Sequence, residues 1–144
     1  GIKLPTANLK GKGLTMIQKH ENLLFCSGNG PLKPDGTPMW TGKLGSDLTV
    51  EEGYQAARQC GINLLGKLKD FLGDLDKVDQ IIKVFGLVAS EPDFYKQPQV
   101  MHGFSDLMVD IFGQRGLHAR SAMGTNVLPL NIPVEVEMIV RIKE

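Results

Sequence analysis

The residues of this chain best suited to chemistry lie in its last third. Arg120 stands within the segment 118–124, and the segment that follows carries Glu135 and Glu137. A planar guanidinium can bind a carboxylate through two parallel hydrogen bonds, a geometry that lysine cannot reproduce. A nearby carboxylate can position a water molecule or accept its proton, typically for a ~10²–10⁴-fold acceleration. Arg120 with a glutamate is therefore a candidate site for a small organic acid.

Each of these side chains also has a purely structural interpretation. Arg120 could be an ion-pair partner where two subunits meet, and Glu135 or Glu137 could be solvated or paired across such an interface. His118 precedes Arg120 by two residues on one strand face, where it could touch a ligand or be a structural histidine. Ser105 is more often a surface residue than a site residue. The residue types alone leave these alternatives open.

Composition limits the classes of protein to consider. A chain of 144 residues is long enough for one hydrophobic core, so we expect a single domain over 1–144. Its 16 basic and 16 acidic side chains give no net charge, and nucleic-acid binding normally requires a basic excess. We expect no membrane or secretory segment, because the apolar runs are short. Cys26 and Cys60 show no disulfide or metal-site spacing, which favours reduced, buried thiols in the cytoplasm, without metal or cofactor.

Two amphipathic helices must carry part of the core. The first is predicted to begin after Thr49, where Thr-Val-Glu-Glu forms a capping box, and to end at Gly73. The second covers 100–112 and ends at Gly113, with Pro98 tolerated only in its first turn. Apolar residues recur at helical spacing in both segments, so each helix should cover one face of another layer.

Strand patterns elsewhere in the sequence predict a β-sheet as that layer. The runs 14–19 and 23–27 predict a hairpin, and a short extended piece is expected around 39–43. The β-branched run within 78–89 suits a central strand buried on both faces. Two further strands are expected at 118–125 and 134–142, the latter with alternate valines on a core-facing side.

The order of these elements predicts an α+β fold. Its mixed sheet should carry two helices packed on one face. The opposite face would then be bare, and oligomerisation is the simplest way to cover it.

A family resemblance emerges when the motifs are taken together and in order. They occupy 23–31, 41–45, 56–59, 73–78 and 118–124. The chain resembles a divergent subgroup of the RidA family, also called YjgF or, by an older label, the L-PSP endoribonuclease family. This resemblance implies a chorismate-mutase-like α+β fold, a homotrimer, and clefts where subunits meet. It also implies hydrolysis of enamines and imines of the 2-aminoacrylate type to 2-oxo acids and ammonia.

The same resemblance implies roles for individual residues. Arg120 would hold the substrate carboxylate, and Glu135 would position or activate water. The turn that contains Ser27, Gly28 and Asn29 would lend backbone amides to the substrate.

Three positions depart from the family pattern. Leu14 stands where a tyrosine is usual, Ala122 where a cysteine is usual, and Ser105 where an asparagine is frequent. With His118, these residues complete the expected substrate-binding set. Because the changes remove polar contacts, two alternatives stay open: a non-catalytic binder of small carboxylate metabolites, or an endoribonuclease as in the older label. Neutral charge and few aromatic residues argue against the latter.

Overall fold

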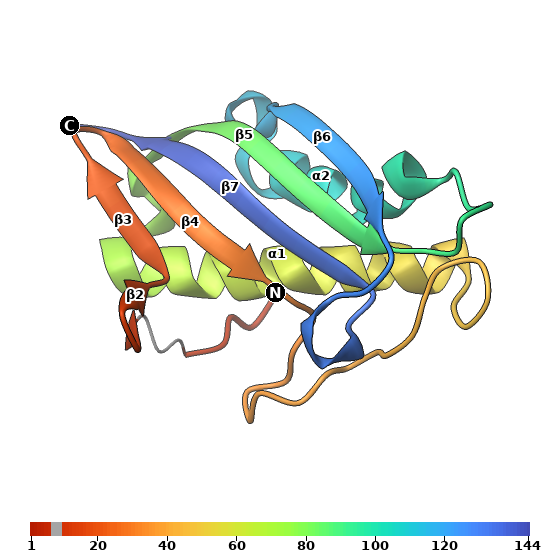
Figure 1. Cartoon of the computed structure of the whole chain (residues 1–144). Helices are drawn as coiled ribbons and strands as arrows, with labels where there is room; N and C mark the ends of the chain where they lie inside the picture. The colour runs from red at the N-terminus through yellow and green to blue at the C-terminus, as the bar shows by residue number, and fades with distance from the viewer. Residues whose placement is uncertain (7–9) are drawn as a thin grey trace.

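A five-stranded sheet with two helices against one of its faces forms the framework of the protein (Figure 1). The computed structural model describes residues 1–6 and 10–144. Its elements in chain order are β1 (Lys10–Gly11), β2 (Leu14–Thr15), β3 (Ile17–His20), β4 (Leu23–Asn29), α1 (Val50–Leu72), η1 (Leu75–Lys77), β5 (Val78–Ala89), α2 (Gln97–Phe112), η2 (Gly113–Gly116), β6 (Ala119–Thr125), η3 (Pro129–Asn131) and β7 (Val134–Ile142).

The main sheet is mixed. Its strand order is β3-β4-β7-β5-β6, and β1 pairs separately with β2. Strands β5 and β6 run parallel, while the other neighbours are antiparallel. A parallel pair needs a crossover, and α2 supplies it. The predicted α+β class, with a mixed sheet and both helices on one face, is confirmed.

Two details of the strand prediction are wrong. The central strand is β7, whereas β5 lies between β7 and the edge strand β6. Side chains of β5 alternate between buried and half-buried positions, because one face of the sheet lacks a covering helix. The extended piece expected around 39–43 forms no strand of the sheet; Gly42 instead adopts φ 111° and donates its amide to the Asn131 carbonyl.

Helix α1 begins and ends where local chemistry predicts, and α2 ends at Gly113 as predicted but begins at Gln97, before the predicted segment 100–112. The Thr49 hydroxyl accepts from the Glu52 amide at 3.2 Å, and the Glu52 carboxylate accepts from the Thr49 amide at 3.0 Å. Gly73, at φ 84°, closes α1 by donating to the Lys69 carbonyl. Pro98 lies in the first turn of α2, where its missing amide proton breaks no helical hydrogen bond.

The core lies between the helices and the sheet. In β7, Val134, Val136 and Val140 are fully buried, and they alternate with outward-facing side chains. The helices cross very closely: a Cβ atom on Gly103 would lie 2.0 Å from the Tyr54 carbonyl oxygen. Glycine is required there because any side chain would push α2 away from α1.

No helix of the described residues covers the other sheet face (Figure 1). Phe25 is 43% exposed and Met123 is 53% exposed, although both stand on strands of the main sheet. A shallow hollow on this face is lined by Phe25, Phe85 and Ile139 together with the charged pair Lys83 and Glu137. Apolar side chains are therefore exposed on this face.

Candidate functional site

Arg120 is positioned by the edge strand and by the helix behind it. On β6 it pairs with Val84, a fully buried residue, so both side chains point toward the helical side of the sheet. One terminal nitrogen, NH1, donates to Ser105 Oγ at 3.1 Å and to His102 Nδ1 at 3.1 Å. Ser105 and His102 are three residues apart on α2 and therefore share a helix face. Both side chains of α2 therefore contact the guanidinium at NH1, on one side only.

Ser105 also contacts His118, so the three predicted residues form one cluster. His118 Nε2 lies 2.9 Å from Ser105 Oγ, and His118 Nδ1 lies 2.6 Å from the Gly116 carbonyl oxygen. A carbonyl oxygen can only accept a hydrogen bond, so Nδ1 carries the proton in the neutral ring. Nε2 then accepts a hydrogen bond from the Ser105 hydroxyl. The chain of donors therefore runs from Arg120 through Ser105 to His118.

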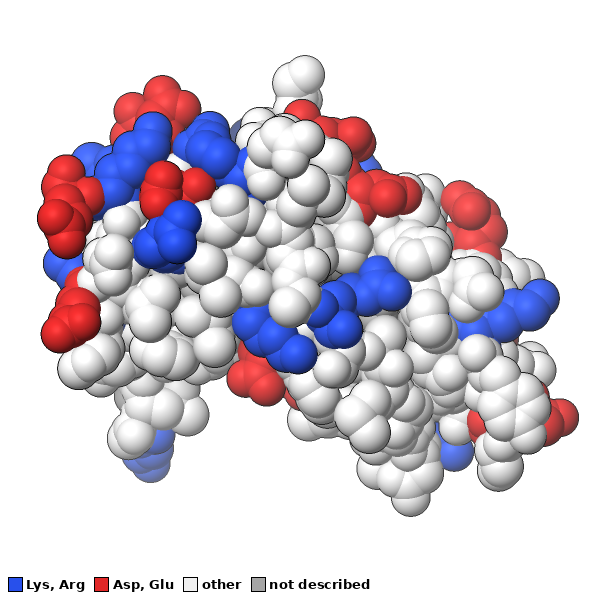
Figure 2. All heavy atoms as spheres, turned by 90° about the horizontal axis from the view of Figure 1, so that it is seen from above, with Lys and Arg blue, Asp and Glu red and all other residues white. Residues whose placement is uncertain are grey.

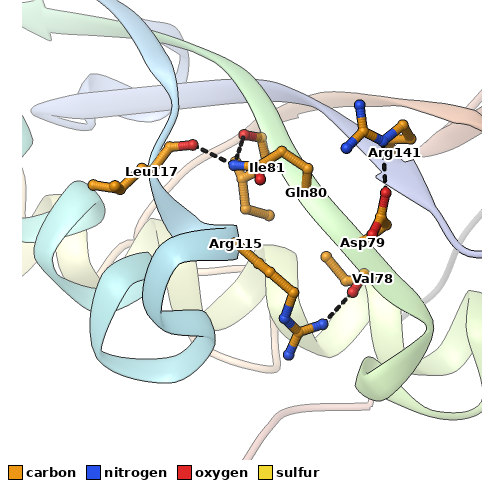
Figure 3. Close-up of polar contacts among 7 residues, drawn as sticks. All are labelled: Val78, Asp79, Gln80, Ile81, Arg115, Leu117 and Arg141. Carbon is orange, nitrogen blue, oxygen red and sulfur yellow. Dashed lines mark hydrogen bonds and ion pairs between the residues drawn. The ribbon is translucent and has the colours of Figure 1, made fainter.

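The turn that carries Gly116 is tied to the neighbouring strand (Figure 3). An Arg115 guanidinium nitrogen donates to the Val78 carbonyl, and the Gln80 side-chain amide donates to the Leu117 carbonyl. Gly116 fits this turn only as glycine, because a Cβ there would lie 2.2 Å from the Met108 carbonyl oxygen. These contacts fix the carbonyl that orients His118.

Arg120 combines a charge with partial burial. Within the described residues no carboxylate lies at ion-pairing distance from its guanidinium; Asp106 is the acid close enough to act on it electrostatically. Burial lowers the pKa of Arg120, and the Asp106 charge opposes that shift. Burial also lowers the pKa of His118; the bond to Gly116 opposes this and the Arg120 charge adds to it. The cluster is suited to receive an anion.

Glu135 lies on the opposite face of the sheet. It pairs with Leu87, three residues beyond Val84 on β5, so its side chain points away from the helices and from Arg120 of the same chain. It stands over Gly28, where a Cβ would be 3.0 Å from the Glu135 carboxyl carbon. Burial, then repulsion from Glu137, raises the pKa of Glu135. One chain alone does not bring Arg120 and Glu135 together.

The predicted turn at the end of β4 is split between the two faces. Gly28 lies beside Glu135, whereas the Asn29 side chain is buried and accepts from Lys67 Nζ of α1 at 2.6 Å. The Ser27 hydroxyl donates to the Thr15 carbonyl at 3.0 Å. Lys67 thus anchors the strand end that places Gly28 near Glu135.

The two remaining predicted residues lie apart from each other. Ala122 is two residues beyond Arg120 on the same face and packs against the core. Leu14 is 56% exposed in β2, outside the main sheet.

Two residues of this arrangement were missed by sequence reasoning. His102 could have been found from its spacing of three from Ser105 on one helix face. Lys67 lies on the apolar side of α1 and gives no such signal, because its partner Asn29 is 38 residues away.

The charge pattern and the metal-ligand residues give negative findings. Acidic and basic side chains are scattered over the face seen in Figure 2, without a continuous basic surface. Across residues 1–6 and 10–144, no group of three His, Cys, Asp or Glu side chains is arranged to hold a metal ion. None of the described helices is both long and apolar enough to cross a bilayer.

Comparisons with known proteins agree with this fold. Residues 15–142 match the family described as "YjgF/chorismate mutase-like, putative endoribonuclease". Protein TCP17 of Trypanosoma cruzi is 39% identical over 143 residues, which cover 99% of this chain and 89% of TCP17.

Two solved structures are closely similar. Atu1372 of Agrobacterium tumefaciens, described as a protein of unknown function, is 38% identical with a TM-score of 0.90, over 99% of this chain and 86% of that chain. A protein of Shewanella oneidensis, described as a "putative endoribonuclease", is 31% identical with a TM-score of 0.91, over 98% and 93%.

Proposed function

The chain belongs to the YjgF/chorismate mutase-like family, and from this membership we propose that it is an enamine/imine deaminase. It hydrolyses reactive 2-imino acids of the 2-aminoacrylate type to 2-oxo acids and ammonia. Arg120 binds the substrate carboxylate, and Glu135 positions the attacking water or accepts its proton.

The observation that carries this proposal is the state of the Arg120 guanidinium. NH1 donates hydrogen bonds to Ser105 and His102, while no described side chain accepts a hydrogen bond from Nε or NH2. These two nitrogens form a fork that matches the two oxygens of a carboxylate. A half-buried cation with an open fork favours a small organic acid as its ligand.

The catalytic pair requires a second copy of the chain. Arg120 and Glu135 point to opposite faces of one sheet, so each can meet the other only across a subunit boundary. The open sheet face is the boundary we propose, since it exposes Phe25 and has a hollow lined by Lys83 and Glu137. We propose a homotrimer in which each site combines Arg120 of one subunit with Gly28 and Glu135 of the next.

Glu135 has suitable acid–base properties for this role. Its raised pKa makes the carboxylate a stronger base than an ordinary glutamate. Gly28, directly beneath it, leaves space for a substrate or water where a larger residue would collide with the carboxyl group.

The decisive experiment couples the protein to an amino-acid oxidase that generates 2-imino acids. Semicarbazide traps the imine, and the formation of 2-oxo acid is followed with and without the protein. We expect acceleration that falls at least ~100-fold in Arg120→Met and remains reduced in Arg120→Lys, because lysine lacks the fork. Lys19→Met, an exposed cation on β3, is the control and should leave the rate unchanged.

A folded protein with no acceleration across a panel of amino acids would contradict the deaminase proposal. Leu14, Ala122 and Ser105 replace polar residues of the family pattern, so a second candidate is a non-catalytic binder of small carboxylates. Thermal stabilisation by a 2-oxo acid that disappears in Arg120→Met, without turnover, would favour this candidate.

A further inference from the structure

Ser105 and His118 do more than fill space beside Arg120, because their hydrogen bonds have a fixed direction. The Gly116 carbonyl keeps the proton of neutral His118 on Nδ1, so Ser105 must donate to Nε2. The Ser105 hydroxyl proton is then unavailable to a ligand at Arg120. Ser105 can only accept from the guanidinium while His118 is neutral.

Protonation of His118 reverses this arrangement. Nε2 then carries a proton and donates to Ser105 Oγ, so the hydroxyl accepts from both His118 and Arg120. Only the Ser105 hydroxyl then separates the imidazolium from the Arg120 guanidinium, so the two positive charges repel each other. A bound carboxylate would offset that repulsion.

We propose that Ser105 and His118 are proton-linked positioning residues for Arg120, and that a ligand carboxylate and a proton at His118 bind cooperatively. The ligand part of this inference rests on the proposed function. The carboxylate occupies the Nε–NH2 edge of Arg120, Ser105 and His118 hold the NH1 side, and affinity rises as the pH falls.

The neighbouring charges are compatible with this coupling. The charge that acts on His118 is that of Arg120, two residues further along the chain. His102 of α2 contacts the same guanidinium, and Asp106 acts on it electrostatically. Asp106 is engaged by the Tyr54 hydroxyl of α1 at 2.7 Å. On the β5 side, the uncharged Gln80 amide donates to the Leu117 carbonyl next to His118, and Lys83 pairs with Ala119.

Calorimetry with pyruvate tests the proposal directly. Binding is measured from pH 5 to pH 8, in buffers of different ionisation enthalpy, so that the number of protons taken up is counted. At a separation of several ångströms near the surface, one charge should alter the affinity about tenfold over this range. We expect proton uptake, tighter binding at low pH, and loss of both effects in His118→Asn, with binding at pH 8 largely preserved.

Control variants separate the histidines. His20→Asn, in the β3–β4 hairpin, is the control and should keep the pH dependence. Ser105→Ala removes the hydroxyl that links His118 to Arg120 and should reduce the pH dependence, whereas Ser105→Thr should restore it. Pyruvate binding that is independent of pH, or pH dependence that survives His118→Asn, overturns the inference and leaves the carboxylate site intact.

A second measurement needs no ligand. Ring ¹⁵N NMR should show the Nδ1-protonated form of neutral His118, and the pKa of His118 should rise in Arg120→Met. A His118 titration unaffected by Arg120→Met also overturns the inference. Absence of pyruvate binding at every pH, together with a coupled His118 titration, would instead contradict the proposed function and the ligand part of the inference.

Discussion

At the scale of residues, the candidate site depends on two charged side chains, Arg120 and Glu135, that form no ion pair within the described residues. Arg120 receives hydrogen-bond acceptors from α2 but no carboxylate from the part of the chain that the structure describes. Glu135 is likewise half-buried, with Glu137 as its charged neighbour. An arginine and a glutamate in such surroundings favour a role in binding over a role in stability, since unpaired, partly buried charge destabilises a fold.

The pH dependence of turnover should report on Glu135. In the proposed mechanism Glu135 acts in its ionised form, so we expect the rate to fall as the pH falls through a pKa that lies above the ordinary 4.5. Glu137→Gln removes a repulsive charge, lowers that pKa and should move the acid limb to lower pH. Glu91→Gln, near Ser46, is the control. An acid limb that stays in place in Glu137→Gln would argue against Glu135 as the base.

The two thiols should be inert in the native protein. Burial raises the pKa of Cys26 to about 12 and raises that of Cys60 as well. The thiolate is the reactive species, so neither residue should react with a thiol reagent at pH 8 within the time in which both react after denaturation. Titration with Ellman's reagent, with and without guanidinium chloride, checks this. Rapid labelling of the native protein would contradict the buried positions.

At the scale of elements, the site depends on the distance between α1 and α2. Gly103→Ala should destabilise the protein by roughly 2–3 kcal/mol, because its Cβ would collide with the Tyr54 carbonyl and force the helices apart. Asp110→Ala, on an exposed part of α2, is the matched control and should change the stability little. Chemical denaturation measures both. A stable Gly103→Ala variant would mean that α2, and with it Ser105, can shift without cost.

The elements were largely predictable because their signals are local. Thr49 with Glu52, Gly73 and the alternation of Val134 and Val136 are each read within a few residues. The loop around Gly42 was mistaken for a strand because its anchor, the Asn131 carbonyl, is remote in sequence. The cluster around Arg120 could be predicted only in part, since the register between α2 and β6 decides that His102 joins it.

At the scale of the whole molecule, the proposed site between subunits depends on the open sheet face. Phe85→Glu would place a charge in the apolar hollow of this face, so we expect the proposed trimer to dissociate and deaminase activity to disappear together. Ile111→Glu, an exposed apolar residue on α2, is the control and should leave both unchanged. Light scattering after gel filtration gives the mass. Monomeric wild-type protein with full activity would refute a site between subunits.

The position of β6 at the edge of the sheet has a dynamic consequence. An edge strand has one hydrogen-bonded neighbour, so the segment that carries Arg120 should open to solvent more often than β5 or β7. Its backbone amides should therefore exchange for deuterium sooner. A small acid that links this strand to α2 through the guanidinium would slow that exchange, and the protection pattern would trace the ligand's footprint on the chain.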